Sequence, residues 1–183
     1  MRVIGGTSRG RRLRAPAGTA TRPTSDRVRE AVFDMLATIV DLEGSAVLDL
    51  FAGSGAMGIE ALSRGAGSAV FVERAPAALA SIRANLASTG LDDGRGTPTR
   101  AEAIVWLARP HHFDVAFVDP PYAFDQWEEL LSRLDASVAV LESDRELDPA
   151  VSWEIVRRKR YGDTLVTVVR HADAARQGQK GIP

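Results

Sequence analysis

The tetrapeptide Asp119-Pro120-Pro121-Tyr122 combines residue types that suit chemistry on an amino group. It follows an apolar run at residues 113–118, and ligands of open α/β sheets lie at the carboxyl ends of strands. The Asp119 carboxylate and the Pro120 carbonyl are two acceptors that could hold both hydrogens of an exocyclic amino group. The prolines would stiffen the turn, and the Tyr122 ring could stack on a base taken out of its stack. The alternative is a plain Pro-Pro turn that Asp119 caps.

A glycine-rich loop follows the predicted strand at residues 46–50 and is a candidate cofactor site. Gly53, Gly55 and Gly58 would let the backbone turn tightly and lie against a ligand. Their spacing also satisfies the dinucleotide fingerprint, with Glu73 at about the expected distance beyond them. The glycines therefore indicate the fold and leave NAD and S-adenosylmethionine open.

The acidic residues favour S-adenosylmethionine. A carboxylate at Asp49 would repel the pyrophosphate of a dinucleotide, whereas it suits a ligand that carries an ammonium and a sulfonium. Glu73 is placed to accept hydrogen bonds from ribose hydroxyls. Glu102 could lie near an adenine, or it could begin a helix, where acids are favoured. The expected cofactor-binding residues are Asp49, Phe51, Gly53, Gly55, Glu73 and Glu102.

These sites imply in-line displacement of the sulfonium methyl by a base amino group, with no metal. Positioning would supply much of the rate. Whether Asp119 also takes up the released proton is open. The pair His111-His112 lacks a third ligand at useful spacing, so we expect loop residues and no metal site there.

Alternating strand and helix signals predict the scaffold that positions the site. Strand-like runs alternate with helical ones, which favours a parallel sheet covered on both faces. The last two strand-like runs, 152–160 and 164–170, are joined by Tyr161-Gly162-Asp163, which predicts an antiparallel hairpin. The other strands are expected at residues 46–50, 68–73, 97–100, 113–118 and 137–141, and helices from Thr24 or Ser25 through Val40, to about Arg64, and at 76–89, 103–108 and 127–134.

The charge is unevenly distributed. Residues 1–30 carry a net charge of +6 and the remainder −7, within a chain of 183 residues and net charge −1. An arginine-rich arm on an acidic body suits a polyanion, although a solubilising tail is the alternative. We expect a basic extension at residues 1–24, which could form a short hairpin or remain loose until a partner binds, and a catalytic domain at 25–183. The absence of cysteine, of a membrane-spanning run and of a signal peptide is compatible with the cytoplasm.

The sequence resembles the RsmD family of class I methyltransferases. The Asp119–Tyr122 tetrapeptide and the Asp49–Gly55 loop match the amino-methyltransferase signatures. The more specific matches are Arg2-Val3-Ile4-Gly5-Gly6, Arg9-Gly10-Arg11-Arg12-Leu13, Arg22-Pro23-Thr24-Ser25-Asp26-Arg27-Val28-Arg29-Glu30, Glu60-Ala61-Leu62-Ser63-Arg64-Gly65-Ala66 and Tyr161-Gly162-Asp163-Thr164.

This resemblance implies a Rossmann-like α/β fold with a seven-stranded, mostly parallel sheet. It implies methylation of a guanosine N2 in 16S rRNA, on an assembled or assembling 30S subunit. Asp119, Pro120, Pro121 and Tyr122 would hold the guanine amino group. The arm would grip rRNA through Arg9, Arg11, Arg12, Arg22 and Arg27. Glu102 departs from the Asp or Asn of many relatives, which leaves the adenine contact open.

Other functions stay open. The tetrapeptide recognises an amino group and no particular base, so adenine-N6 or cytosine-N4 methylation of DNA is the alternative within the same chemistry. A NAD-dependent oxidoreductase and a non-catalytic rRNA-binding assembly factor are alternatives of other classes. We expect a monomer that does not associate with membranes.

Overall fold

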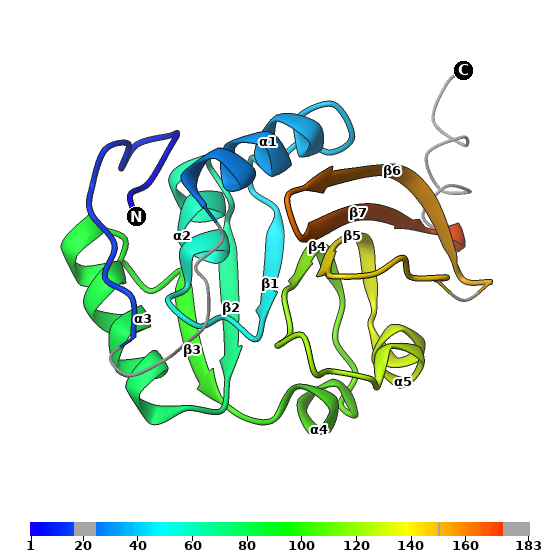
Figure 1. Ribbon diagram of the computed structural model, residues 1–183. Coiled ribbons are helices and arrows are strands. Elements are labelled where there is room, and N and C mark those ends of the chain that lie inside the picture. Colours follow the sequence, from blue (N-terminus) through cyan, green and yellow to red (C-terminus); the bar gives the residue numbers. More distant parts are fainter. Residues whose placement is uncertain (17–24, 150, 174–183) are drawn as a thin grey trace, which may run out of the picture.

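The computed structural model describes residues 1–16, 25–149 and 151–173. A central sheet lies between two layers of helices (Figure 1). The elements, in chain order, are α1 (Asp26–Leu36), β1 (Ala46–Leu50), α2 (Ala56–Ser63), β2 (Ser68–Glu73), α3 (Pro76–Thr89), β3 (Gly96–Arg100), α4 (Ala103–Leu107), β4 (Phe113–Val118), α5 (Trp127–Arg133), β5 (Ala136–Ser143), β6 (Trp153–Tyr161) and β7 (Thr164–His171).

The seven strands lie in the order β3-β2-β1-β4-β5-β7-β6. The first five are parallel to one another, while β7 is antiparallel to β5 and to β6. The strand order reverses between β1 and β4, and ligands of open α/β sheets bind at such a switch point. The predicted Rossmann-like methyltransferase fold, with its terminal antiparallel hairpin, is therefore confirmed.

Two apolar cores fill the space between the layers. On one face of the sheet, α1, α2 and α3 pack with Val3 and Leu13 of the N-terminal segment against Phe71, Phe117 and other strand residues. On the opposite face, α4 and α5 pack against Leu50, Val118 and Leu141. Because both faces are covered, β1, β4 and β5 are almost continuously buried, as is typical of parallel strands.

Local signals explain most helix ends. Ser25 caps α1 by accepting a hydrogen bond from the Val28 amide at 3.3 Å. Pro76 begins α3, and Gly90 ends it in the left-handed conformation. The predicted extension of α1 to Val40 is wrong: the helix ends at Leu36, and the Thr38 hydroxyl and the Ile39 amide donate to the last-turn carbonyls. The apolar period continues past the helix because Ile39 and Val40 still pack on the core.

The N-terminal segment forms the predicted short hairpin. An antiparallel bridge joins Arg2 and Arg12, and the amides of Val3 and Gly10 donate to Arg11 and Val3 carbonyls at 2.9 Å each. Val3 and Leu13 are buried against the helices. The domain boundary predicted at residue 24, the candidate cap Thr24 and most of the polar tail after His171 lie outside the described residues.

Candidate active site

The carboxyl ends of neighbouring parallel strands bring three predicted site acids together. Asp49 of β1 pairs in register with Phe71 of β2 and with Phe117 of β4. Glu73 and Asp119 each lie two residues beyond those phenylalanines. Electrostatic repulsion from both acids acts on Asp49. The loop and the tetrapeptide, far apart in the sequence, thus form one site at the switch point.

The loop backbone is held in conformations that glycine favours. Phe51 (φ 58°), Gly53 (φ 54°) and Gly55 (φ 75°) all lie in the left-handed region, which is unusual for phenylalanine. The Phe51 ring packs edge-on against Phe124, with ring centroids 5.3 Å apart. At Gly58 a Cβ would stand 2.4 Å from Cε1 of Phe71, so only glycine lets α2 approach the sheet this closely. The strained backbone at Phe51 makes this turn a candidate functional site.

Asp49 is buried, and its Oδ2 accepts a hydrogen bond of 2.9 Å from the Gly58 amide. Burial raises the pKa of Asp49 to about 8; the Gly58 hydrogen bond opposes this rise, and repulsion by Asp119 and Glu73 adds to it. The acid is therefore largely protonated at neutral pH in the unliganded protein. A cationic ligand beside it would favour the carboxylate, so the site fits an ammonium or sulfonium better than a phosphate.

Glu73 joins the loop to the start of α3. One carboxylate oxygen accepts from the Gly53 amide at 3.0 Å and the other from the Ala75 amide at 2.8 Å. Each oxygen has a second lone pair, and the side chain is only partly buried, so ribose hydroxyls can still donate to it. The position of Glu73 is thus compatible with binding ribose hydroxyls while the acid also holds the Gly53 and Ala75 amides.

Glu102 takes the capping role. It is the N-cap of α4, and its carboxylate accepts a hydrogen bond of 3.0 Å from the Val105 amide. The side chain is exposed at the end of β3, next to β2 in the sheet. Its contact with an adenine stays a prediction.

The tetrapeptide projects from the end of β4 as predicted. Asp119 is exposed, Pro120 is buried, and Tyr122 is 52% exposed, so the acid and the ring are both accessible to a substrate. A small hollow opens beside them. Its lining residues are Pro120, Pro121, Tyr122, Phe124, Trp127, Glu142, Ser143, Asp144 and Arg145. The end of β5 was not expected in the site, because nothing in its sequence separates it from an ordinary strand end.

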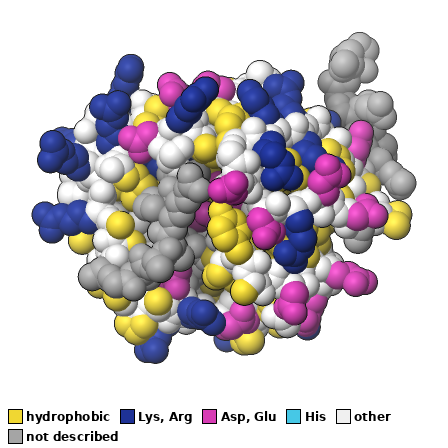
Figure 2. Space-filling view, in the orientation of Figure 1, with side chains coloured by type: hydrophobic (Ala, Val, Ile, Leu, Met, Phe, Trp, Pro, Cys, Tyr) yellow, Lys and Arg dark blue, Asp and Glu magenta, His cyan; other side chains and the backbone are white. Residues whose placement is uncertain are grey.

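The predicted RNA-contacting arginines are accessible where they are described. Arg9, Arg11 and Arg12 on the hairpin and Arg27 on α1 are exposed, whereas Arg22 lies outside the described residues. In Figure 2 the Lys and Arg side chains gather along the upper and left outline of this face, the part of the molecule where Figure 1 places the hairpin and α1.

Hydrogen bonds from Asn85 on α3 connect the segment that follows the basic hairpin to the cofactor loop. The Asn85 side chain on α3 donates to the Arg14 carbonyl at 3.0 Å and to the Ser54 carbonyl at 2.9 Å. The hairpin is thereby fixed relative to the loop.

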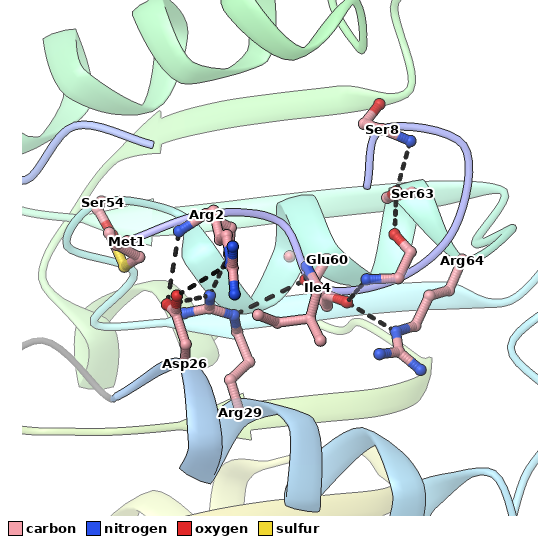
Figure 3. Close-up of polar contacts among 12 residues, drawn as sticks. Met1, Arg2, Ile4, Ser8, Asp26, Arg29, Ser54, Glu60, Ser63 and Arg64 are labelled. Atoms are coloured by element: carbon pink, nitrogen blue, oxygen red, sulfur yellow. Dashed lines mark hydrogen bonds and ion pairs between the residues drawn. The ribbon is translucent and has the colours of Figure 1, made fainter. Parts of the chain in front are cut away.

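Glu60 and Arg29 form a buried cluster that the sequence did not reveal. Figure 3 shows the Glu60 carboxylate close to Ile4, Arg29 and Arg64. The carboxylate accepts hydrogen bonds of 2.7 Å from each of the Ile4 and Gly5 amides and of 2.8 Å from Arg64 Nε, and it lies 3.7 Å from Arg29 Nε. Arg29 also bonds Asp26 and the Arg2 carbonyl. Although Arg29 counts toward the basic arm in sequence, it is fully buried and does not face solvent.

His111 and His112 serve structural roles. The His111 ring stacks on Trp106 with centroids 3.9 Å apart, and His112 pairs with Asp135 at 2.8 Å. Within residues 1–16, 25–149 and 151–173, no group of three or more histidine, cysteine or acidic side chains could hold a metal ion. In the same part of the chain, no helix has the length and apolar character needed to cross a membrane.

A switch-point site with a glycine loop and the Asp-Pro-Pro-Tyr turn, on this strand order, defines a class I methyltransferase. The family model described as "Conserved hypothetical protein 95" matches residues 1–170, and the chain belongs to this family. The ribosomal RNA small subunit methyltransferase D of Escherichia coli strain K12 is 39% identical, covering 88% of this chain and 85% of its own. That of Haemophilus influenzae is 33% identical, covering 88% and 89%. The resemblance to RsmD is thus confirmed.

Solved structures agree with this assignment. The yhhF protein of Escherichia coli is 35% identical with a TM-score of 0.82 and covers 93% of this chain and 97% of its own. A protein complexed with SAH is 15% identical with a TM-score of 0.64, covers 79% of this chain and 48% of its own, and shows the fold alone. Membership of a methyltransferase family confirms the predicted cofactor, S-adenosylmethionine.

Proposed function

We propose that this protein transfers the methyl group of S-adenosylmethionine to the exocyclic N2 of a guanosine in 16S rRNA, on an assembled or assembling 30S subunit in the cytoplasm. One observation carries the proposal: the pairing of β1 with β4 sets the Asp119–Tyr122 turn beside the glycine loop. The relatives at 33% and 39% identity are named ribosomal RNA small subunit methyltransferase D, and these names support the substrate class.

The turn makes a poor nucleophile reactive. An amino group on a base donates its lone pair into the ring, and acceptors on both hydrogens draw the nitrogen towards a tetrahedral geometry. The Asp119 carboxylate and the Pro120 carbonyl accept those hydrogens, and the two prolines hold both oxygens in place before the substrate arrives. The exposed Tyr122 ring offers a stacking surface for the base.

The loop positions the methyl donor. When bound, S-adenosylmethionine supplies an electrophilic methyl on a sulfonium. Asp49 favours its positive charge, and Glu73 accepts hydrogen bonds from its ribose hydroxyls. The loop that contains the left-handed residues Phe51, Gly53 and Gly55 lies against it. The residues of this chain therefore hold donor and acceptor in line, which is the main demand of this displacement.

The basic hairpin supports a polyanionic substrate. Its exposed arginines suit phosphate groups. Hydrogen bonds that connect the hairpin with Ser54, through Asn85, and with Glu60 fix the distance between these arginines and the cofactor loop. The acidic remainder of the surface would disfavour a polyanion elsewhere, so binding at the hairpin orients the RNA.

The test is nucleoside mass spectrometry after incubation with S-adenosylmethionine and one of three substrates: 30S subunits from cells lacking the protein, naked 16S rRNA, or duplex DNA. We expect N2-methylguanosine in RNA. Methyladenine or N4-methylcytosine formed only in DNA contradicts the rRNA substrate. A thermal shift with NAD and none with S-adenosylmethionine contradicts the cofactor.

A further inference from the structure

A run of four cations, Arg157-Arg158-Lys159-Arg160, interrupts the acidic remainder of the chain. It lies in the carboxyl half of β6, the strand at one edge of the sheet, and Arg157, Lys159 and Arg160 are exposed. Figure 2 shows a group of Lys and Arg side chains in the upper right part of the face, where Figure 1 places β6. Such a run is either a solvated edge that discourages strand pairing or a surface that binds an anion.

The register of the sheet places this run level with the Asp119–Tyr122 turn. One row of paired residues crosses four strands: Val118 of β4, Leu141 of β5, Thr167 of β7 and Arg158 of β6. Because β7 is antiparallel to both of its neighbours, β6 runs in the same direction as β4. Lys159 therefore follows the row on β6 as Asp119 follows it on β4. Three strand spacings separate the two strands, which corresponds to about 14 Å across the sheet.

Two of the four side chains share the face of the sheet on which the N-terminal hairpin packs. Arg157 and Lys159 pair with Val168 and Val166, which belong to the core under α1, α2 and α3. Paired residues on neighbouring strands project to the same face. The hairpin is held by α2 and α3, beside β1 and β2, whereas β6 is at the opposite end of the strand order. The turn that follows β4 thus lies between two basic surfaces.

The contacts of the run leave Arg157 and Lys159 available to an anion. The Arg158 guanidinium is engaged, since it donates to Glu146 at 3.0 Å and to the Leu147 carbonyl at 2.7 Å. Across residues 1–16, 25–149 and 151–173, neither Arg157 nor Lys159 takes part in an ion pair. The Lys159 ammonium lies 5.2 Å from the centroid of the Tyr161 ring, a contact that orients the cation and leaves it a phosphate partner to bind.

The distribution of charge along β6 favours binding over edge protection. Charged residues keep an edge strand from pairing with another chain, and the half of β6 that needs this most is the amino-terminal one, where Ile155 is 41% exposed. That half carries the acid Glu154 and no cation. The cations are concentrated instead at the end of the strand that is level with the turn, as a role in substrate binding requires.

We propose that Arg157 and Lys159 bind RNA phosphates next to the target guanosine, on the β6 side of the Asp119–Tyr122 turn, as a second contact besides the hairpin. This inference rests on the proposed function and adds the path of the RNA across the site. Phosphate contacts fix the register of a nucleic acid on a protein and carry no sequence information. Cations on both sides of the turn hold the strand while the unstacked base occupies the site.

The test is the salt dependence of binding to a single-stranded RNA that contains the target guanosine, once mapped. The double variant Arg157→Gln/Lys159→Gln removes two positive charges at exposed positions. We expect the slope of log affinity against log salt to fall by about 1.4, since each lost phosphate contact on single-stranded RNA is worth about 0.7. Affinity for S-adenosylmethionine stays at the wild-type value, which shows that the variant is folded.

The matched control is the exchange Arg157→Lys/Lys159→Arg, which keeps both charges and should keep the wild-type slope. Arg109→Gln, at an exposed arginine after α4, should keep it too. An unchanged slope in the double variant overturns the proposal, as does an equal fall in Arg109→Gln. Self-association of the double variant at an unchanged slope also overturns it, because the run then only protects the edge. Failure of the proposed function is distinct, since the wild type then forms no N2-methylguanosine whatever the slopes.

Discussion

Asp49 Oδ2 and the Gly58 amide lie 2.9 Å apart, so this acid near the carboxyl end of β1 is bonded to the first turn of α2. The same acid lies close enough to Asp119 and Glu73 for their charges to raise its pKa further. The Asp49 side chain thus contacts α2 behind the cofactor loop and is close to the Asp119–Tyr122 turn, so its protonation state depends on both.

The raised pKa of Asp49 makes folding stability depend on pH. Because the pKa rises from 3.8 unfolded to about 8 folded, the folded state holds the proton more tightly. The resulting stabilisation is complete below pH 3.8 and is lost as the pH rises to about 8. Asp49→Asn removes this dependence while its amide oxygen still accepts from Gly58. Denaturant unfolding of both unliganded proteins should show the variant gaining stability relative to the wild type between these pH values. A difference that stays constant with pH contradicts the assignment.

Binding of the sulfonium cofactor should release a proton. A cation beside Asp49 favours the carboxylate, so at pH 7 the acid loses the proton that it holds in the unliganded protein. Calorimetry in buffers of different ionisation enthalpy measures this release directly. We expect release approaching one proton per site in the wild type and markedly less in Asp49→Asn. Equal release from both proteins means that the proton comes from another group.

Removing the Glu60 carboxylate should loosen the N-terminal hairpin. Glu60→Ala removes the fully buried counter-charge of Arg29 and frees the Ile4 and Gly5 amides. Loss of one partner of a buried ion pair costs about 3 kcal/mol or more. Denaturant unfolding measures the loss, and hydrogen exchange at Ile4 and Gly5 should accelerate. Glu146→Ala, at an exposed side chain, should change the stability by less than about 0.5 kcal/mol.

The hairpin arginines should set the salt dependence of RNA binding. Replacing Arg9, Arg11 and Arg12 together with alanine removes up to three phosphate contacts at exposed positions. The slope of log affinity against log salt should fall by about 0.7 per lost contact on single-stranded RNA. Affinity for S-adenosylmethionine should not change. Arg109→Ala, an exposed arginine after α4, is the control. An unaltered slope in the triple variant means that these three arginines do not contact RNA phosphates, which contradicts the prediction.

The fold was predictable because the central strands β1, β4 and β5 are apolar runs bounded by turn residues, and because Ser25 and Gly90 mark helix ends locally. The site motifs were predictable for the same reason: Asp49 lies near the end of the buried strand β1, and Asp119 directly follows the buried strand β4. The protonation of Asp49 was not predictable, since it depends on burial and on two acids from other strands.

Two other features were hidden because neighbours distant in sequence create them. In the sequence Glu60 looks like an ordinary helix acid and Arg29 like part of the basic arm. In the fold the hairpin covers Glu60, and Arg29 forms ion pairs with Glu60 and Asp26.

The most direct test of the central claim is single-turnover methyl transfer to 30S subunits from cells lacking the protein, comparing the wild type with Asp119→Asn. If the Asp119 carboxylate holds and activates the guanine amino group, the variant forms N2-methylguanosine at least about 100-fold more slowly while binding S-adenosylmethionine as the wild type does. A variant that methylates at the wild-type rate contradicts the account.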